Sequence, residues 1–170
     1  MAEHRFDIGV IVARKKLKSP WADHVWLPYA VLPAVPATAP GTPLGTDGAD
    51  ELFYAGPFEL TLHPSETAYY RDNLSAARPS LWVSLRSCGG DGCGIAAVTA
   101  NPYEGEALTE GIDAIVEAVP MPKEIQAKVT AFFAAFHVER PFIKRERKCP
   151  DLEALGHRPR VPGASRAEGK

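Results

Sequence analysis

The chain has 170 residues, of which 45% are apolar, and a formal net charge of -2. This length fits one domain, because domains of about 100–200 residues are the common size. No stretch approaches the ~20 consecutive apolar residues of a membrane-spanning helix, and the N-terminus lacks the apolar core of a signal peptide. We therefore expect a soluble cytoplasmic protein without a membrane partner, whose 3 cysteines suit a reducing compartment.

The charges are unevenly distributed along the chain. Residues 1–18 carry a net charge of +3, residues 19–138 carry -9, and residues 139–170 carry +4. An acidic body opposes phosphate binding, so the charge disfavours a nucleic-acid partner. A basic cluster in the last segment could instead steer an acidic protein partner, or form a solvated tail. Its members are Lys144, Arg145, Arg147 and Lys148.

Alternating or continuous short apolar runs, bounded by turn residues, predict the strands. The predicted strands cover residues 5–13, 25–35, 52–62, 81–86, 95–100 and 113–119. Pro28 and Pro33 place the second strand at a sheet edge or a bulge, because proline cannot donate to a strand ladder. Residues 36–50 are rich in Pro, Gly and Thr, and we expect them to form one long loop.

Three helices are predicted. The first covers residues 66–75, with Ser65 as its N-cap, and the second covers residues 103–109. The last begins at Pro122 and ends near Glu139, before Pro141. Its large apolar residues fall on one stripe that should cover a sheet face. They are Ile125, Val129, Phe132, Phe133 and Phe136.

These elements predict an α+β fold, since most neighbouring strands are joined by turns rather than long crossovers. We expect a mostly antiparallel sheet or partial barrel of about six strands, with two short helices and one C-terminal amphipathic helix. The predicted domain covers residues 1–148. Residues 149–170 contain few large apolar side chains and are predicted to be a largely disordered tail.

The first candidate site is a segment in which two tryptophans flank an Asp–His pair. Its residues are Trp21, Asp23, His24 and Trp26. Exposed tryptophan anchors protein interfaces, so these residues are a candidate partner-binding surface. Asp23 could also orient the His24 imidazole as a base or metal ligand, although neighbours in a strand point to opposite faces. The alternative is that both tryptophans pack internally and His24 bonds to the backbone.

A second candidate site is a small-molecule or cofactor pocket formed by His63, Glu66, Tyr70 and Arg71. Titratable side chains where a strand meets a helix suit acid–base chemistry. We expect His24 to belong to this pocket as well, and His24, His63 and a carboxylate could hold a metal if the strands bring them together. If this pocket forms, the protein would be an enzyme that binds a small molecule or cofactor, which is the alternative to a partner-binding protein.

Cysteines provide only a weak candidate. Cys88 and Cys93 flank a Gly-rich segment and could pair or bind a metal, but a tetrahedral zinc site would also need Cys149 or a histidine. The alternative is a hairpin tip of small residues. The sequence contains no phosphate-binding glycine motif, H-E-x-x-H or G-x-S-x-G, so we assign no catalytic residue, no metal and no cofactor.

The order of several short motifs resembles that of a proteobacterial family of unknown function. The motifs are PWADHVW at 20–26, AVLP at 30–33, YAG at 54–56, ELTLH at 59–63, ET at 66–67 with Tyr70 and NL at 73–74, RPSLWV at 78–83, VTANPYE at 98–104, VPMP at 119–122 and HVERPFIKR at 137–145.

Members of this family look to be encoded beside formate dehydrogenase and other molybdenum-enzyme genes, and some carry the label molybdopterin-guanine dinucleotide biosynthesis protein A. Guanylyltransferases of that kind open with a Gly-rich nucleotide loop, whereas residues 1–20 here contain one glycine, Gly9. The gene neighbourhood that the resemblance implies, together with the missing catalytic motif, the proline-containing edge strand and the basic tail, favours a non-catalytic accessory protein. Its partner would be a subunit of a molybdenum enzyme, such as a formate dehydrogenase, bound during maturation.

Overall fold

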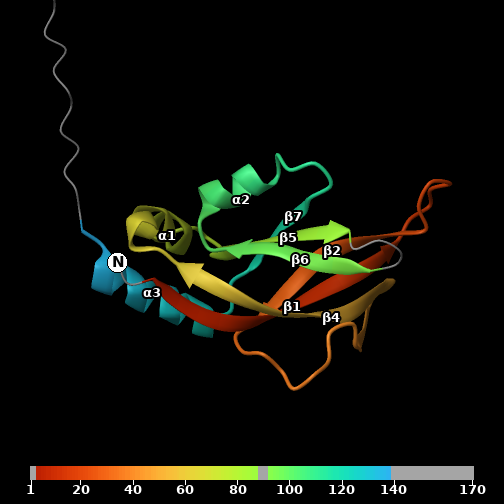
Figure 1. Ribbon diagram of the computed structural model, residues 1–170, viewed down its shortest axis with the longest axis horizontal. Coiled ribbons are helices and arrows are strands. Elements are labelled where there is room, and N and C mark those ends of the chain that lie inside the picture. The colour runs from red at the N-terminus through yellow and green to blue at the C-terminus, as the bar shows by residue number, and fades with distance from the viewer. Residues whose placement is uncertain (1–2, 88–91, 139–170) are drawn as a thin grey trace, which may run out of the picture. The chain divides into compact units, whose positions relative to one another are not determined.

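A computed structural model describes residues 3–87 and 92–138. Within them the chain forms two antiparallel sheets, with strand orders β2-β1-β4-β3 and β6-β5-β7 (Figure 1). The predicted α+β class is confirmed, and the described strands form two sheets rather than a closed barrel. The strands are β1 (His4–Lys16), β2 (His24–Leu32), β3 (Pro43–Asp47), β4 (Asp50–Leu62), β5 (Ser80–Ser87), β6 (Cys93–Thr99) and β7 (Ile115–Pro120). The helices are α1 (Thr67–Leu74), α2 (Pro102–Leu108) and α3 (Lys123–Phe136).

Strand β1 organises the four-stranded sheet, because it pairs with β2 on one side and with β4 on the other. Strand β2 lies at the edge of this sheet and contains Pro28, as the proline pattern predicts. The pairing between β1 and β2 shifts register between Ile11 and Val12, where Val12 faces Pro28 and Ile11 faces Ala30. The missing N–H of Pro28 is thus accommodated beside a bulge.

The prediction of one loop over residues 36–50 is wrong, because it contains strand β3. This strand pairs with β4, and Asp47 faces Asp50 across a two-residue turn. Gly48 has φ +61°, the left-handed value that the first central position of a tight hairpin turn needs. The Asp47–Gly48 dipeptide was the available sequence signal. This turn signal did not lead to a predicted strand, because all five residues of β3 are exposed and show no apolar alternation.

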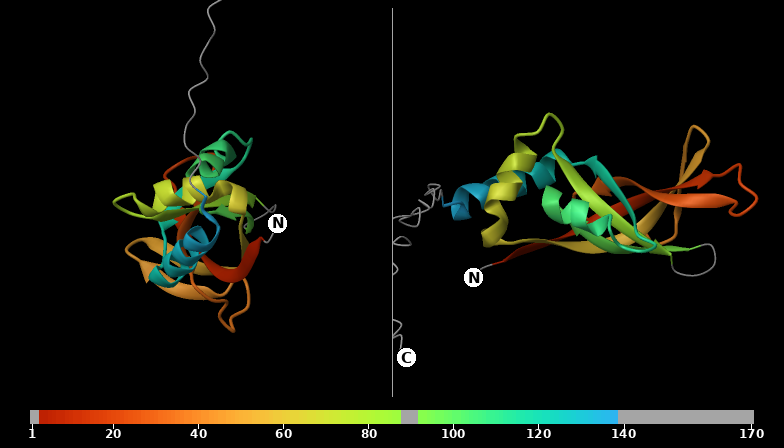
Figure 2. Two further views of the ribbon diagram at one scale, coloured as in Figure 1. Left: turned by 90° about the vertical axis from the view of Figure 1, so that its left-hand side faces the viewer. Right: turned by 90° about the horizontal axis from the view of Figure 1, so that it is seen from above.

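The hydrophobic core lies where the two sheets meet, with β7 against β2 and β6 against β4. Side chains from both sheets and from α3 form a single buried cluster. Its most completely buried members are Ile8, Val10, Leu60, Leu62, Leu81, Val83, Ile125 and Val129. Helices α1 and α3 pack together at one end of these sheets, and the β1–β2 hairpin projects at the other (Figure 2).

Buried Asn73 attaches α1 to the second sheet. Its Nδ2 donates to the carbonyl oxygens of Ser80 (2.8 Å) and Ala100 (2.7 Å), and its Oδ1 accepts from the Ser80 N–H (3.0 Å). Two of these bonds join Asn73 to Ser80, and the third reaches Ala100, 27 residues away. Losing the Asn73 side chain would leave buried polar groups without partners.

The predicted boundaries of two helices are wrong. Helix α1 is preceded by a 3₁₀ turn at Pro64–Glu66, so Ser65 lies inside a helical turn and is not the N-cap. Helix α3 ends at Phe136, not near Glu139, because His137 takes an extended conformation. His137 Nδ1 there forms a hydrogen bond with Thr67 Oγ1 at 3.1 Å. In the predicted stripe, Ile125, Val129 and Phe132 are buried, while Phe136 remains 40% exposed.

Helix α2 lies close to the indole ring of Trp82 in β5. Gly105 is buried, and a Cβ atom at this position would overlap the Trp82 ring. We expect Gly105→Ala to lower the free energy of unfolding by about 1–3 kcal/mol, since overpacking displaces the helix or the indole.

The matched control for this prediction is Glu106→Ala, an exposed position on the same helix, which should change stability by less than about 0.5 kcal/mol. Urea unfolding of the two variants and the wild type measures both effects. Equal stability of Gly105→Ala and wild type would contradict the close packing of α2 on Trp82.

Candidate functional site

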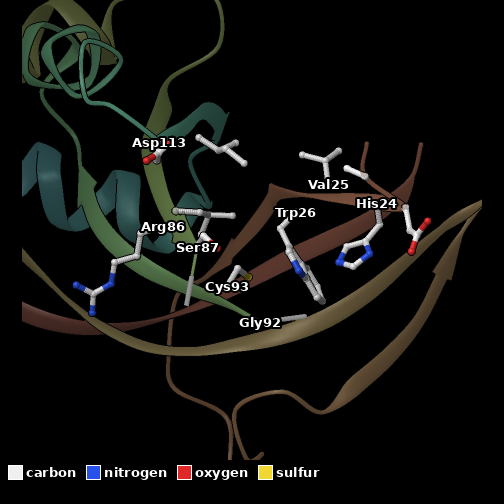
Figure 3. Close-up of a pocket in the computed structure, with 12 residues that line it drawn as sticks. His24, Val25, Trp26, Arg86, Ser87, Gly92, Cys93 and Asp113 are labelled. Carbon is white, nitrogen blue, oxygen red and sulfur yellow. The ribbon is translucent and has the colours of Figure 1, made fainter. Parts of the chain in front are cut away.

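A cavity of about 330 Å³ opens beside the first residues of β2 (Figure 3). Three parts of the chain form its walls: the end of the β1–β2 loop with the start of β2, the adjoining ends of β5 and β6, and the start of β7 with the residues before it. The lining residues are Ala22, Asp23, His24, Val25, Trp26, Leu85, Arg86, Ser87, Gly92, Cys93, Asp113 and Ile115. We call this the β2 cavity.

Trp26 forms the central wall of the β2 cavity and is held by aromatic contacts. Its ring meets that of Phe53 edge-on, with centroids 5.2 Å apart, and that of His24 at 5.8 Å. The Arg14 guanidinium lies 5.9 Å from the Trp26 ring and 5.2 Å from the Phe53 ring. Such cation–π and edge-to-face contacts fix a ring in one orientation.

A carboxylate fixes Arg14 in turn. Arg14 Nε and Nη2 donate to Glu51 Oε2 at 2.8 and 2.5 Å. The hydrogen bond and charge of Arg14 lower the pKa of Glu51, which keeps this carboxylate ionised. A series of contacts therefore links three strands: the Glu51 carboxylate on β4 holds the Arg14 guanidinium on β1, which contacts the Trp26 indole on β2. These contacts set the position of the cavity wall.

A second cavity of about 240 Å³ lies on the Phe53 side and shares three lining residues with the β2 cavity: Trp26, Gly92 and Cys93. Figure 3 shows the side chains of Trp26 and His24 next to each other, with the Cys93 sulfur directed toward Trp26 and the Arg86 guanidinium directed away from it. Trp26 thus lines two small spaces, and charged and polar side chains contribute to the walls of the β2 cavity.

The two most exposed large apolar side chains of the described residues are next in sequence to residues that line the β2 cavity. Trp21 is 92% exposed and Ile112 is 94% exposed. Each adjoins a lining residue in the chain, Ala22 and Asp113 respectively. Asp113 lies on one side of the cavity and His24 on the other in Figure 3. We call the loop before β2, which contains Trp21, and the turn before β7, which contains Ile112, the two rims of the cavity.

The structure gives the four residues of the first predicted site different roles. Asp23, His24 and Trp26 line the β2 cavity, and Trp21 stands on its rim. Trp26 is half-buried and forms part of the cavity wall, whereas Trp21 is exposed. The sequence offered two alternatives, that both tryptophans are exposed anchors or that both pack internally, and neither holds for the pair. The sequence did not reveal Arg86, Asp113 or Ile115 as wall residues, because only the meeting of the two sheets brings them to β2.

The second predicted site is partly assembled, as a hydrogen-bonded corner. The Tyr70 hydroxyl donates to Glu66 Oε2 at 2.8 Å and accepts from the His63 backbone N–H at 3.0 Å. The His63 ring lies near Glu3, with Nδ1 and Oε1 3.4 Å apart. Arg71 is exposed and pairs with Asp72. Tyr70, only 1% exposed, therefore fastens α1 to the end of β4.

His24 does not join this corner. His24 faces Lys16 at one end of β1, whereas Leu62, the neighbour of His63, faces His4 at the other end. The two ends of this 13-residue strand are on the order of 40 Å apart at about 3.3 Å per residue. A single pocket containing both histidines is incompatible with this placement.

The remaining predicted site residues fall outside the described residues. These are Cys88, Cys149, the basic cluster Lys144, Arg145, Arg147 and Lys148, and the predicted tail 149–170. Within residues 3–87 and 92–138, no group of three or more His, Cys, Asp or Glu side chains is arranged to hold a metal ion. No helix in this described part is long and apolar enough to cross a membrane.

These observations define an α+β protein with two antiparallel sheets and a small cavity whose rims carry exposed apolar side chains. A family model described as "Protein of unknown function (DUF3305)" matches residues 7–147, and the chain belongs to this family. The prediction of a family of unknown function is thereby confirmed, while the molybdenum-enzyme association stays a prediction. No curated protein and no solved structure matches the chain.

The different environments of the two tryptophans predict different stabilities for their alanine variants. Trp26→Ala should lower the free energy of unfolding by about 2 kcal/mol, below the full cost of a buried Trp truncation because Trp26 is half-buried. Trp21→Ala should change it by less than about 0.5 kcal/mol. Urea unfolding followed by far-UV circular dichroism measures both, and equal losses would contradict the assignment of Trp26 to the wall.

The buried hydroxyl of Tyr70 leads us to predict that the folded protein loses stability at alkaline pH. Burial, assisted by the Glu66 carboxylate, raises the pKa of Tyr70 far above its ordinary value. The folded state therefore keeps a proton that the unfolded chain loses above about pH 10, and stability falls as pH rises through this range. Tyr70→Phe should be less stable at neutral pH, because it loses two hydrogen bonds, but should decline less steeply from about pH 10 to pH 12. Parallel slopes would show that Tyr70 is not responsible.

Proposed function

We propose that this protein is a non-catalytic accessory protein that binds a partner protein through the surface formed by Trp21, Asp23, His24 and Trp26. The observation that carries the proposal is the exposure of Trp21, which is 92%. A folded protein gains little from holding an indole in water, whereas tryptophans that enter a partner's pocket often supply much of the binding energy.

The contacts around Trp21 support a preorganised surface. Trp26 is held by Phe53 and Arg14, so the wall next to the exposed indole is already in place before a partner arrives. Preorganisation lowers the entropy that binding must overcome. Trp21 supplies the anchor in this proposal, and Trp26 supplies a rigid apolar surface beside it.

We further propose that the partner is a subunit of a molybdenum enzyme, such as a formate dehydrogenase, and that binding takes place during its maturation or assembly. The support for this identity is the resemblance in motif order, with the gene neighbourhood that it implies. Lys144, Arg145, Arg147 and Lys148 would steer an acidic surface of this subunit, since complementary charges chiefly raise association rates.

An affinity purification from the native host, grown under conditions that induce molybdenum enzymes, tests this proposal. The tagged wild type should recover a molybdenum-enzyme subunit in stoichiometric amount, identified by mass spectrometry. Trp21→Ala should reduce the recovery by about tenfold or more, as expected for a hot-spot residue. The matched control is Tyr103→Ala, which removes another exposed aromatic side chain, 57% exposed, on α2.

Three results would contradict parts of this proposal. Recovery of the tagged protein alone under inducing conditions contradicts the accessory function. Equal recovery by Trp21→Ala and wild type contradicts the assigned surface. Recovery of a partner unrelated to molybdenum enzymes contradicts the partner's identity while leaving the surface in place.

A further inference from the structure

We infer that the β2 cavity receives an extended segment of the partner in which one large apolar side chain lies between an acidic end and a basic end. This inference rests on the proposed function and specifies the chemistry of the partner. Its basis is the arrangement of apolar and charged side chains on the two rims.

The apolar part of the argument is that both rims present an anchor. Trp21 stands on the rim formed by the β1–β2 loop, and Ile112 stands on the rim formed by the turn before β7. Between them, Val25, Trp26, Leu85 and Ile115 contribute apolar walls. A large apolar side chain inserted here would pack against these walls, and the flanking residues of the segment would cover the exposed apolar surface of the rims.

The size of the space limits what can enter. A volume of about 330 Å³ lies near the lower limit of the roughly 300–1,000 Å³ typical of ligand pockets. An α-helix with its side chains is about 10–12 Å wide and would need a long groove. The cavity therefore suits one large side chain from an extended segment.

The charged part of the argument is that the two rims differ in sign. On the β1–β2 rim, Lys15, Lys16 and Lys18 are exposed, and Asp23 opposes them. Lys16 faces His24 in the β1–β2 ladder, and directly opposed residues point to the same sheet face, so the Lys16 side chain leaves the sheet on the same face as His24, which lines the cavity. This rim has a net positive charge.

The opposite rim is acidic. Glu110 and Asp113 are exposed on either side of Ile112, and Arg86 on the adjacent strand only partly offsets them. Figure 3 shows the Arg86 guanidinium directed away from the Trp26 side of the cavity. A segment that crosses the cavity would therefore be favoured if its acidic end met the lysines and its basic end met Glu110 and Asp113.

Fluorescence polarisation with labelled synthetic peptides tests this inference on the full-length protein. The probes share a central Phe and differ in their flanks: acidic then basic, basic then acidic, acidic on both sides, and basic on both sides. We expect one of the two mixed peptides to bind at least about fivefold more tightly than either uniform peptide at low salt. Replacing its Phe by Ala should weaken binding by about tenfold.

Substitutions on the two rims test whether the peptide preference arises at the β2 cavity. Ile112→Ser should weaken the preferred peptide several-fold, whereas Leu44→Ser, which alters another exposed apolar residue on β3, should not. The double variant Lys16→Glu with Lys18→Glu should reverse the preference in favour of the peptide that is basic on both sides. Lys123→Glu, an exposed position on α3, is the charge control and should leave the preference unchanged.

The outcomes separate this inference from the proposed function. Mixed peptides that bind no better than uniform ones, or a preference that the lysine variants do not reverse, overturn the inference even if a partner is recovered from the host. A mixed-peptide preference that responds to both rims supports the inference even if the recovered partner is not a molybdenum enzyme. Unfolding curves of each variant confirm that it is folded before its binding is compared.

Discussion

The pairing of β1 with both β2 and β4 is the constraint on which the other features depend, because one strand carries core residues at its centre and the support of the cavity near its end. Ile8, Val10 and Val12 point from β1 into the core with almost no exposure. Arg14 continues the same face of the strand, where the neighbouring sheet no longer covers it fully. A guanidinium can occupy this boundary because its stem packs on aromatic rings while its charged end reaches a carboxylate.

The cavity forms where the two sheets stop covering each other. The ends of β5 and β6 and the start of β7 approach the first residues of β2, but the side chains there do not fill the space as they do in the core. Exposed apolar and charged residues follow on the adjoining loops, which have few packing constraints and can hold binding residues on a rigid support. The same strands therefore bury the core in their middle and form the β2 cavity at their ends.

The other end of the sheets is closed by helices and serves a different purpose. Asn73 and Tyr70 attach α1 to the strands by hydrogen bonds, and His137 at the end of α3 meets Thr67 at the start of α1. In the sequence, Tyr70 is a candidate for chemistry together with His63 and Glu66, because titratable residues cluster there. Their partners are mostly backbone and neighbouring side chains, which is the pattern of a structural corner.

Alternating apolar residues determined most strands, and the apolar stripe determined α3, because a strand or helix must bury one face whatever it packs against. The unusual Trp21–Trp26 segment was also visible in the sequence, since two tryptophans near an Asp–His pair are conspicuous without any structure. Only the tertiary structure decided that Trp21 is exposed while Trp26 is a wall, that β3 joins the sheet, and that Asp113 and Ile115 face β2. The outcomes for Trp26, Asp113 and Ile115 depend on contacts between residues far apart in the chain, which leave no period or motif in the local sequence. For β3, the Asp47–Gly48 turn was a local signal, but the exposed strand showed no apolar alternation.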